Sequence, residues 1–151
     1  MSRSALALLA LAVFPACSGG EDDVPPVDPA EEACYHIAEG TVIDAGPTED
    51  EATELALGID PWRVGLYPDQ VSYVSFTSTG ATVVILADAI EVFDSLSTNG
   101  TDVPLPETTE NPTCGQDIPA MLELDLPAGT HILGVGPHYK ASLWMVLAER
   151  G

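Results

Sequence analysis

Alternation of apolar and polar residues with a period of two is the feature that most constrains the fold of this chain. In the segment 121–126, three leucines alternate with Glu123 and Asp125. Strict alternation is typical of a strand with one face in water, and a short continuous apolar run is typical of a strand covered on both faces. The first pattern recurs at 62–67 and 71–78, and the second occurs at 81–87 and 141–148. The sequence therefore predicts sheets stacked around a shared core.

Turn-forming residues separate these segments at short intervals. Closely spaced turns between short strands are typical of antiparallel sandwiches and barrels, and the chain lacks the βα rhythm that a parallel α/β sheet needs. The prediction is an all-β fold, an antiparallel β-sandwich. The turns are expected at Pro68-Asp69, Thr79-Gly80, Asn99-Gly100, Pro127-Ala128-Gly129 and Gly136-Pro137.

A short helix is predicted at 49–57. Thr48 and Glu51 have capping-box spacing, acidic residues fill the first turn, and Gly58 is placed to end the helix. An irregular loop is the alternative for this segment.

The first seventeen residues resemble the signal of a bacterial lipoprotein. Arg3 precedes an apolar run at 5–14, which is too short to span a bilayer as a helix, and Ala16 stands directly before Cys17. The resemblance implies that residues 1–16 are a signal peptide and that Cys17 carries lipid, which would anchor the protein outside the cytoplasm. An ordinary secretory signal is the alternative.

The lipoprotein resemblance also implies a destination. Ser18 follows the cysteine, as in enterobacterial lipoproteins that travel to the outer membrane. Residues 17–33 are rich in glycine, proline and carboxylates without an apolar period, so we expect a disordered acidic tether. The length that remains, 34–151, suits a single β-sandwich domain.

The chain is strongly acidic, with 24 Asp and Glu against 4 Lys and Arg and a net charge of −20. Affinity for nucleic acid comes mainly from Lys and Arg that neutralise phosphates, so this composition argues against nucleic acid as a partner. The same charge repels anionic lipid headgroups. It favours solubility and suits a saline or cation-rich habitat.

Two cysteines, Cys34 and Cys114, are left once Cys17 is assigned to lipid. An even pair in an exported chain predicts one disulfide. A metal or redox role is the weaker alternative, because the chain has no CxxC motif and no histidine at zinc-ligand spacing.

Two patches resemble the strands of jelly-roll accessory domains of the bacterial pre-peptidase C-terminal kind. One is LDLPAGTHILGVG at 124–136 with ASLWMVLAE at 141–149, and the other is VGLYPDQVSYVSF at 64–76. The resemblance implies a jelly-roll-like sandwich that has no catalytic activity. Such modules bind glycans, assist secretion or mediate contacts.

Catalytic and metal-binding motifs are not found in the sequence. There is no HExxH, GxSxG or Walker A motif, and Gly134-Val135-Gly136 lacks the third glycine of a dinucleotide loop. We therefore predict no enzyme activity, no cofactor and no metal site. A geometric triad using one of the three histidines His36, His131 and His138 remains an alternative.

Several polar and aromatic residues are candidates for ligand contacts. Strand parity puts His131 beside Leu133 and Val135, in the core or at its rim, and His138 is expected in an exposed turn. Calcium held by Asp94 and Asp102 is a weaker alternative. Trp62 and Trp144 are predicted to be buried anchors, whereas the candidates for a surface that stacks on sugars are Tyr67, Tyr73 and Tyr139.

Three functions follow as hypotheses, and each requires a different surface. A lipid-anchored binding or structural interaction module of the cell envelope is the main prediction and requires an exposed apolar or aromatic patch. Carbohydrate binding is the alternative and requires tyrosines or tryptophans aligned on one sheet face. A metal-dependent enzyme or metal carrier requires two histidines and a carboxylate at one place. The ligand itself is unknown from the sequence.

Overall fold

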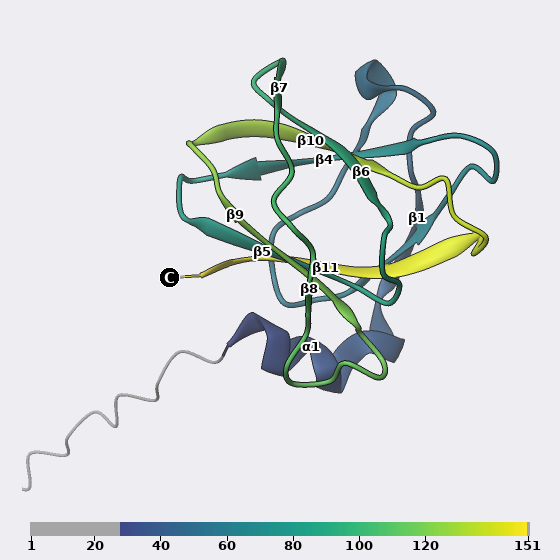
Figure 1. Ribbon diagram of the computed structural model, residues 1–151, viewed down its shortest axis with the longest axis vertical. Helices are drawn as coiled ribbons and strands as arrows, with labels where there is room; N and C mark the ends of the chain where they lie inside the picture. The colour runs from purple at the N-terminus through teal and green to yellow at the C-terminus, as the bar shows by residue number, and fades with distance from the viewer. Residues whose placement is uncertain (1–27, 151) are drawn as a thin grey trace, which may run out of the picture.

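Two β-sheets packed face to face form the computed structural model, which describes residues 28–150 (Figure 1). The predicted signal peptide, Cys17 and the first part of the predicted tether lie outside these residues. The strands are β1 (Thr41–Asp44), β2 (Thr53–Glu54), β3 (Trp62–Gly65), β4 (Ser72–Ser78), β5 (Thr82–Ala87), β6 (Phe93–Thr98), β7 (Thr101–Val103), β8 (Thr109–Glu110), β9 (Ala120–Asp125), β10 (Gly129–Val135) and β11 (Ser142–Arg150).

The chain crosses between the two sheets repeatedly from β3 onward. Sheet A has the order β1-β3-β11-β5-β9-β8, and sheet B has the order β2-β4-β10-β6-β7. Within them, β3-β11-β5-β9 faces β4-β10-β6-β7, which is the eight-strand jelly-roll arrangement with its first and last strands side by side. The predicted all-β sandwich of jelly-roll type is confirmed.

The sheets are mixed and not purely antiparallel, which corrects one part of the prediction. β1 runs parallel to β3, and β2 runs parallel to β4. β1 and β2 lie in different sheets, so each is separated from its partner by a crossover through the opposite sheet. The eight strands from β3 to β11 that form the jelly roll pair in antiparallel fashion.

The predicted periodicities match the burial of the strands. On β9, Leu122 and Leu124 are buried while Glu123 and Asp125 are exposed. On β5, alternate residues enter two separate apolar clusters, with Ile85 between the sheets and Leu86 on the outer face of sheet A. A continuously apolar strand thus has cover on both sides, as its sequence requires.

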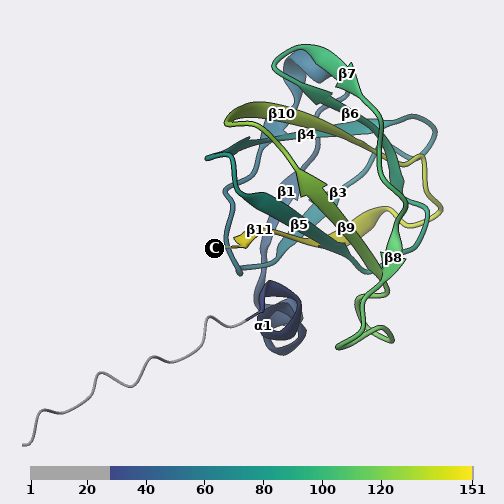
Figure 2. The same ribbon diagram turned by 60° about the vertical axis from the view of Figure 1, so that its left-hand side comes forward.

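Helix α1 (Pro29–His36) covers the outer face of sheet A (Figure 2). The Asp28 side chain accepts a hydrogen bond from the Ala30 N–H at 2.8 Å, and Pro29 occupies the first turn, where its missing N–H does no harm. Ala30 and Ala33 pack on the apolar residues Val84, Leu86 and Val146. The folded part therefore begins inside the segment 17–33 that was expected to be disordered, because a capped helix with two buried alanines packs on the sheet there.

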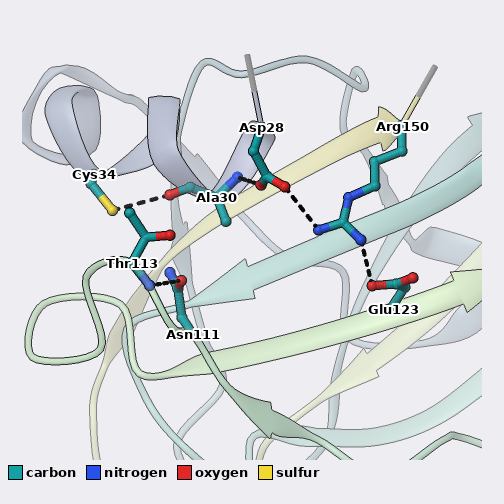
Figure 3. Close-up of polar contacts among 7 residues, drawn as sticks. All are labelled: Asp28, Ala30, Cys34, Asn111, Thr113, Glu123 and Arg150. Atoms are coloured by element: carbon teal, nitrogen blue, oxygen red, sulfur yellow. Dashed lines mark hydrogen bonds and ion pairs between the residues drawn. The ribbon is translucent and has the colours of Figure 1, made fainter. Parts of the chain in front are cut away.

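Two links fasten this helix to the rest of the domain, and Figure 3 shows the one that Arg150 makes. The predicted disulfide between Cys34 and Cys114 is present and joins the helix to the loop before β9. At the other end, Arg150 lies 3.2 Å from the Asp28 carboxylate and 2.6 Å from that of Glu123. The helix is thus held at both ends by contacts far apart in the sequence.

The helix predicted at 49–57 is wrong in extent. Only Glu49–Glu51 forms a single 3₁₀ turn, η2, and the chain then enters β2. The Thr48 hydroxyl donates to the Glu51 carboxylate at 3.1 Å, so the two predicted capping residues meet side chain to side chain. Leu55 is buried in the core between the sheets, which favours extended backbone here.

No helix among residues 28–150 is long and apolar enough to cross a membrane.

Candidate functional site

A hollow of about 620 Å³ opens at one end of the sandwich. Two loops form most of it, the β5–β6 loop and the β10–β11 loop, and Pro119 just before β9 completes it. Their lining combines apolar side chains with two carboxylates. The lining residues are Asp88, Ala89, Ile90, Glu91, Pro119, Pro137, His138 and Tyr139.

Asp88 and Lys140 hold the two loops together. The Lys140 ammonium donates to the Asp88 carboxylate at 3.2 Å and to the Asp88 carbonyl at 3.0 Å. The other carboxylate oxygen of Asp88 accepts the backbone N–H of Trp144 at 3.0 Å. The charge of Asp88 is therefore already compensated, and its role in the hollow is structural.

Ile90 and Tyr139 form an exposed apolar pair within the lining. Their exposed fractions are 54% and 88%, which is high for such large side chains. The ring of His138 stacks on Tyr139 with centroids 4.2 Å apart, and the His138 Nδ1 atom accepts the Lys140 N–H. His138 lies in the predicted turn but is half-buried, and not exposed as the sequence predicted.

Glu91 is the uncompensated charge of the hollow. Its side chain is exposed, and no ion-pair partner for it is present among residues 28–150. Its backbone φ is 59°, in the left-handed region that side-chain-bearing residues rarely occupy. The loop thus holds a carboxylate on the wall of the hollow at some cost in backbone energy.

The basic residues of the described chain are all engaged with groups other than Glu91. Arg63 donates to the Ser142 hydroxyl and lies 5.9 Å from the centre of the Trp144 ring. Lys140 and Arg150 form the ion pairs given above. No lysine or arginine within residues 28–150 is therefore left to neutralise Glu91.

The three tyrosines that the sequence proposed as surface contacts lie in three different hollows. Tyr139 lines the one described above, Tyr67 lines one of about 280 Å³, and Tyr73 lines one of about 440 Å³ on sheet B. Trp62 packs at the edge of the core, and Trp144 is half-buried on the outer face of sheet A. Residues 28–150 thus present no aligned row of aromatic side chains on one sheet face.

The acids considered for calcium do come together. Asp94 and Asp102 line the hollow on sheet B with Glu49 and Tyr73. However, no group of three or more His, Cys, Asp or Glu side chains within residues 28–150 is arranged to hold a metal ion. The described part of the chain also lacks the convergence of histidines that a metal enzyme or carrier requires.

His131 lies in the core, as strand parity predicted. It is fully buried, its Nδ1 atom lies 3.0 Å from the Thr98 hydroxyl, and its Nε2 atom lies 3.1 Å from the Pro127 carbonyl. Burial lowers the pKa of His131, with the Pro127 hydrogen bond acting in the opposite direction. The hydroxyl–imidazole pair resembles half of a catalytic triad, but substrate has no access to a buried ring. His131 is therefore a structural residue.

His36 lies at the end of α1 and does not line any of the three hollows described above. Its ring nitrogens lie 3.2 Å from the carboxylates of Glu39 and Glu32, and hydrogen bonding, chiefly to Glu39, raises the pKa of His36. The three histidines thus lie apart: His36 on α1, His131 in the core, and His138 at the hollow with Tyr139.

Sequence reasoning missed the residues that matter most in the hollow. Ile90, Glu91 and Pro119 lie in loops, where no periodicity marks an exposed side chain. A usable signal was Ile90 itself, a large apolar residue three positions after the end of β5, in the short segment between Asp88 and Glu91. The left-handed backbone of Glu91 has no sequence signature.

The hollow and the start of the described chain lie at opposite ends of sheet A. Ser142, the first residue of β11, follows the loop that lines the hollow, and Arg150 at the other end of β11 holds Asp28. This strand spans roughly 26 Å, at a rise of about 3.3 Å per residue. In Figure 1 the helix α1 begins below the C-terminal end of β11, away from the loop that precedes β11.

Comparison of the chain with protein-family models and with curated proteins gives no match.

Proposed function

We propose that the chain is a lipid-anchored, extracytoplasmic interaction module of a bacterial cell envelope. It binds a protein partner, without catalysis, through the hollow lined by Ile90, Glu91 and Tyr139, which we call the rim hollow. The observation that carries this proposal is the position of the hollow. It holds the exposed pair Ile90 and Tyr139, and it lies at the end of the sandwich opposite to Asp28, where the N-terminal segment enters.

The anchoring part of the proposal rests on the N-terminal sequence. An apolar run followed by Ala16 and Cys17 resembles a lipoprotein signal, and Ser18 suits the outer membrane of a Gram-negative bacterium. A domain fastened at the Asp28 end would present the hollow away from the lipid surface. Such a geometry favours contact with a partner outside the membrane.

The absence of catalysis is inferred from the chemistry of the hollow. Its carboxylates are Asp88, which is paired with Lys140, and the exposed Glu91. His138 is the one imidazole there, and its Nδ1 atom is occupied by a backbone N–H. The resemblance of two patches to noncatalytic pre-peptidase C-terminal domains supports the same proposal.

A protein partner is favoured over a glycan by the arrangement of aromatic side chains. Noncatalytic sugar-binding surfaces need rings lined up for stacking, whereas Tyr67, Tyr73 and Tyr139 lie in separate hollows. Exposed apolar and aromatic side chains that line one hollow are typical of protein interaction sites. We therefore propose the envelope protein and not the carbohydrate as the partner.

Site-specific photocrosslinking in intact cells of the native host tests this function. A photoreactive phenylalanine analogue replaces Tyr139 in one variant and Tyr35 in the other. Both tyrosines are highly exposed, at 88% and 75%, but Tyr35 lies on α1, outside the hollow. We expect a discrete adduct from position 139, in the membrane fraction, and none of that mass from position 35.

Substitution of the neighbouring apolar residue provides a second arm. Ile90→Ser in the position-139 variant should reduce the adduct strongly, because Ile90 lines the same hollow. Equal adducts from positions 35 and 139, or an adduct that is insensitive to Ile90→Ser, would contradict binding at the hollow. Release of an unlipidated protein into the medium would contradict the anchor.

A further inference from the structure

We infer that the rim hollow receives a lysine or arginine side chain presented by the partner protein. This inference rests on the proposed function, since it names the chemistry of the segment that the hollow would bind. Three features of the described residues carry it: the apolar walls, the single unpaired carboxylate, and the charge of the domain around them.

The walls suit the long aliphatic part of a basic side chain. Ile90, Pro119, Pro137 and Tyr139 supply apolar or aromatic surface in one hollow. Lysine and arginine place three or four methylene groups along such surfaces while the charged group remains in contact with water or a counterion. The exposed ring of Tyr139 also offers a face to a cation.

Glu91 supplies the counterion. Asp88 is already bound by Lys140, so Glu91 is the lining carboxylate that is free to form an ion pair. Because Glu91 is exposed, it can pair with a charge of the partner at the surface, without the desolvation penalty of a buried ion pair. The hollow thus combines an apolar surface with one negative charge at its wall.

The surrounding charge selects for a basic partner and against an acidic one. The chain carries a net charge of −20, and the three basic residues of the described part are engaged by Ser142 and Trp144, by Asp88, or by Asp28 and Glu123. A surface of this kind attracts cationic segments over several ångströms and repels anionic ones. Among side chains with a long apolar stem, lysine and arginine therefore fit best.

Ligand-observed NMR with short peptides tests the inference on the full chain purified in detergent. The probes are four capped peptides SGXGS, in which X is Lys, Arg, norleucine or Glu. Saturation transfer from the protein to the side-chain protons of X reports contact, and titration gives the dissociation constant. We expect binding in the order Arg and Lys, then norleucine, with no detectable contact from Glu.

Two pairs of variants separate the hollow from the general charge of the domain. Glu91→Gln should weaken binding of the Lys peptide roughly threefold, the loss expected for an exposed ion pair. Glu107→Gln removes an equal charge from an exposed loop residue that does not line the hollow, and should leave the affinity unchanged. Tyr139→Ala should weaken the Lys peptide, whereas Tyr35→Ala should not.

The outcomes also separate this inference from the proposed function. Equal binding of the Lys and norleucine peptides, or equal losses of affinity in the Glu91→Gln and Glu107→Gln variants, would overturn the inference that the hollow receives a basic side chain. If the crosslink from position 139 persists in that case and still depends on Ile90, the hollow binds a protein of other chemistry. Loss of both results would overturn the hollow as a binding site.

Discussion

The Cα atoms of Cys34 and Cys114 lie 5.9 Å apart, joined by a disulfide between α1 and the loop before β9. This bond closes a loop of 80 residues that contains β1 to β8. Beside it, Ala33 and Ile118 share the apolar cluster on the outer face of sheet A. The covalent link therefore fixes the position of a helix whose own apolar contacts are small.

Removal of this disulfide should destabilise the protein strongly. In the chain-entropy model, a closed loop of this length contributes roughly 4.5 kcal/mol, and loss of native disulfides from secreted domains costs about 2 to 5 kcal/mol. We expect the double variant Cys34→Ser/Cys114→Ser to lose stability in this range in urea unfolding followed by tryptophan fluorescence. A loss below about 1 kcal/mol would mean that the helix docks independently of the bond.

His131 should make the protein less stable in mild acid. Burial lowers its pKa below the ordinary value of 6.5, so the unfolded chain binds a proton more readily than the folded chain does. This contribution to stability is complete above pH 6.5 and is lost as the pH falls below it. Melting temperatures measured from about pH 7.5 to about pH 5.5 should fall more steeply in the wild type than in His131→Gln.

Glu149 should act in the same direction at lower pH. Its carboxylate accepts the Thr79 N–H at 2.6 Å and the Thr79 hydroxyl at 2.9 Å, and the backbone hydrogen bond is the main cause that lowers the pKa of Glu149. The resulting stability is present above pH 4.5 and is lost as the pH falls through the lowered pKa. Acid titration of Glu149→Gln should show a shallower loss than that of the wild type.

Relief of the backbone strain at Glu91 should stabilise the protein. At a φ of 59°, a side chain costs about 1 to 2 kcal/mol that glycine does not incur, although glycine adds freedom to the unfolded chain. We expect Glu91→Gly to raise the free energy of unfolding by roughly 0.5 to 1 kcal/mol. Glu107→Gly, at a residue without positive φ, should lower it. Destabilisation by Glu91→Gly would show that its side chain contributes to folding.

Much of the sandwich could be predicted from the sequence because sheet burial leaves a period of two. The segments 62–67, 71–78, 81–87, 121–126 and 141–148 were identified in this way, whereas β10 was expected only from the resemblance to jelly-roll domains. Asn99 and Gly100 form the expected tight turn, with φ values of 49° and 79°. The parallel strands β1 and β2 were not identified, since four and two residues are too short to show a period. Helix α1 was missed because acidic residues surround its two buried alanines.

The candidate site was less predictable than the fold. Tyr139 was named as a surface residue, and Gly136-Pro137 as a turn, but nothing in the sequence placed them beside Ile90 and Glu91. That proximity follows from the sheet order, which puts β5 next to β11, and from the contact of Lys140 with Asp88. Loop residues are brought together by strands distant in the chain, and this information is absent from local patterns.

The disulfide also determines how mechanical force would travel through the molecule. A pull on the chain ahead of Asp28 acts first on the Arg150 ion pair and on the docked helix, and then reaches Cys34. From there the covalent path jumps to Cys114, a few residues before Pro119 at the edge of the hollow. For the part of a ligand held at Pro119, the disulfide therefore gives tension from the N-terminal segment a covalent path that does not run through β1 to β8.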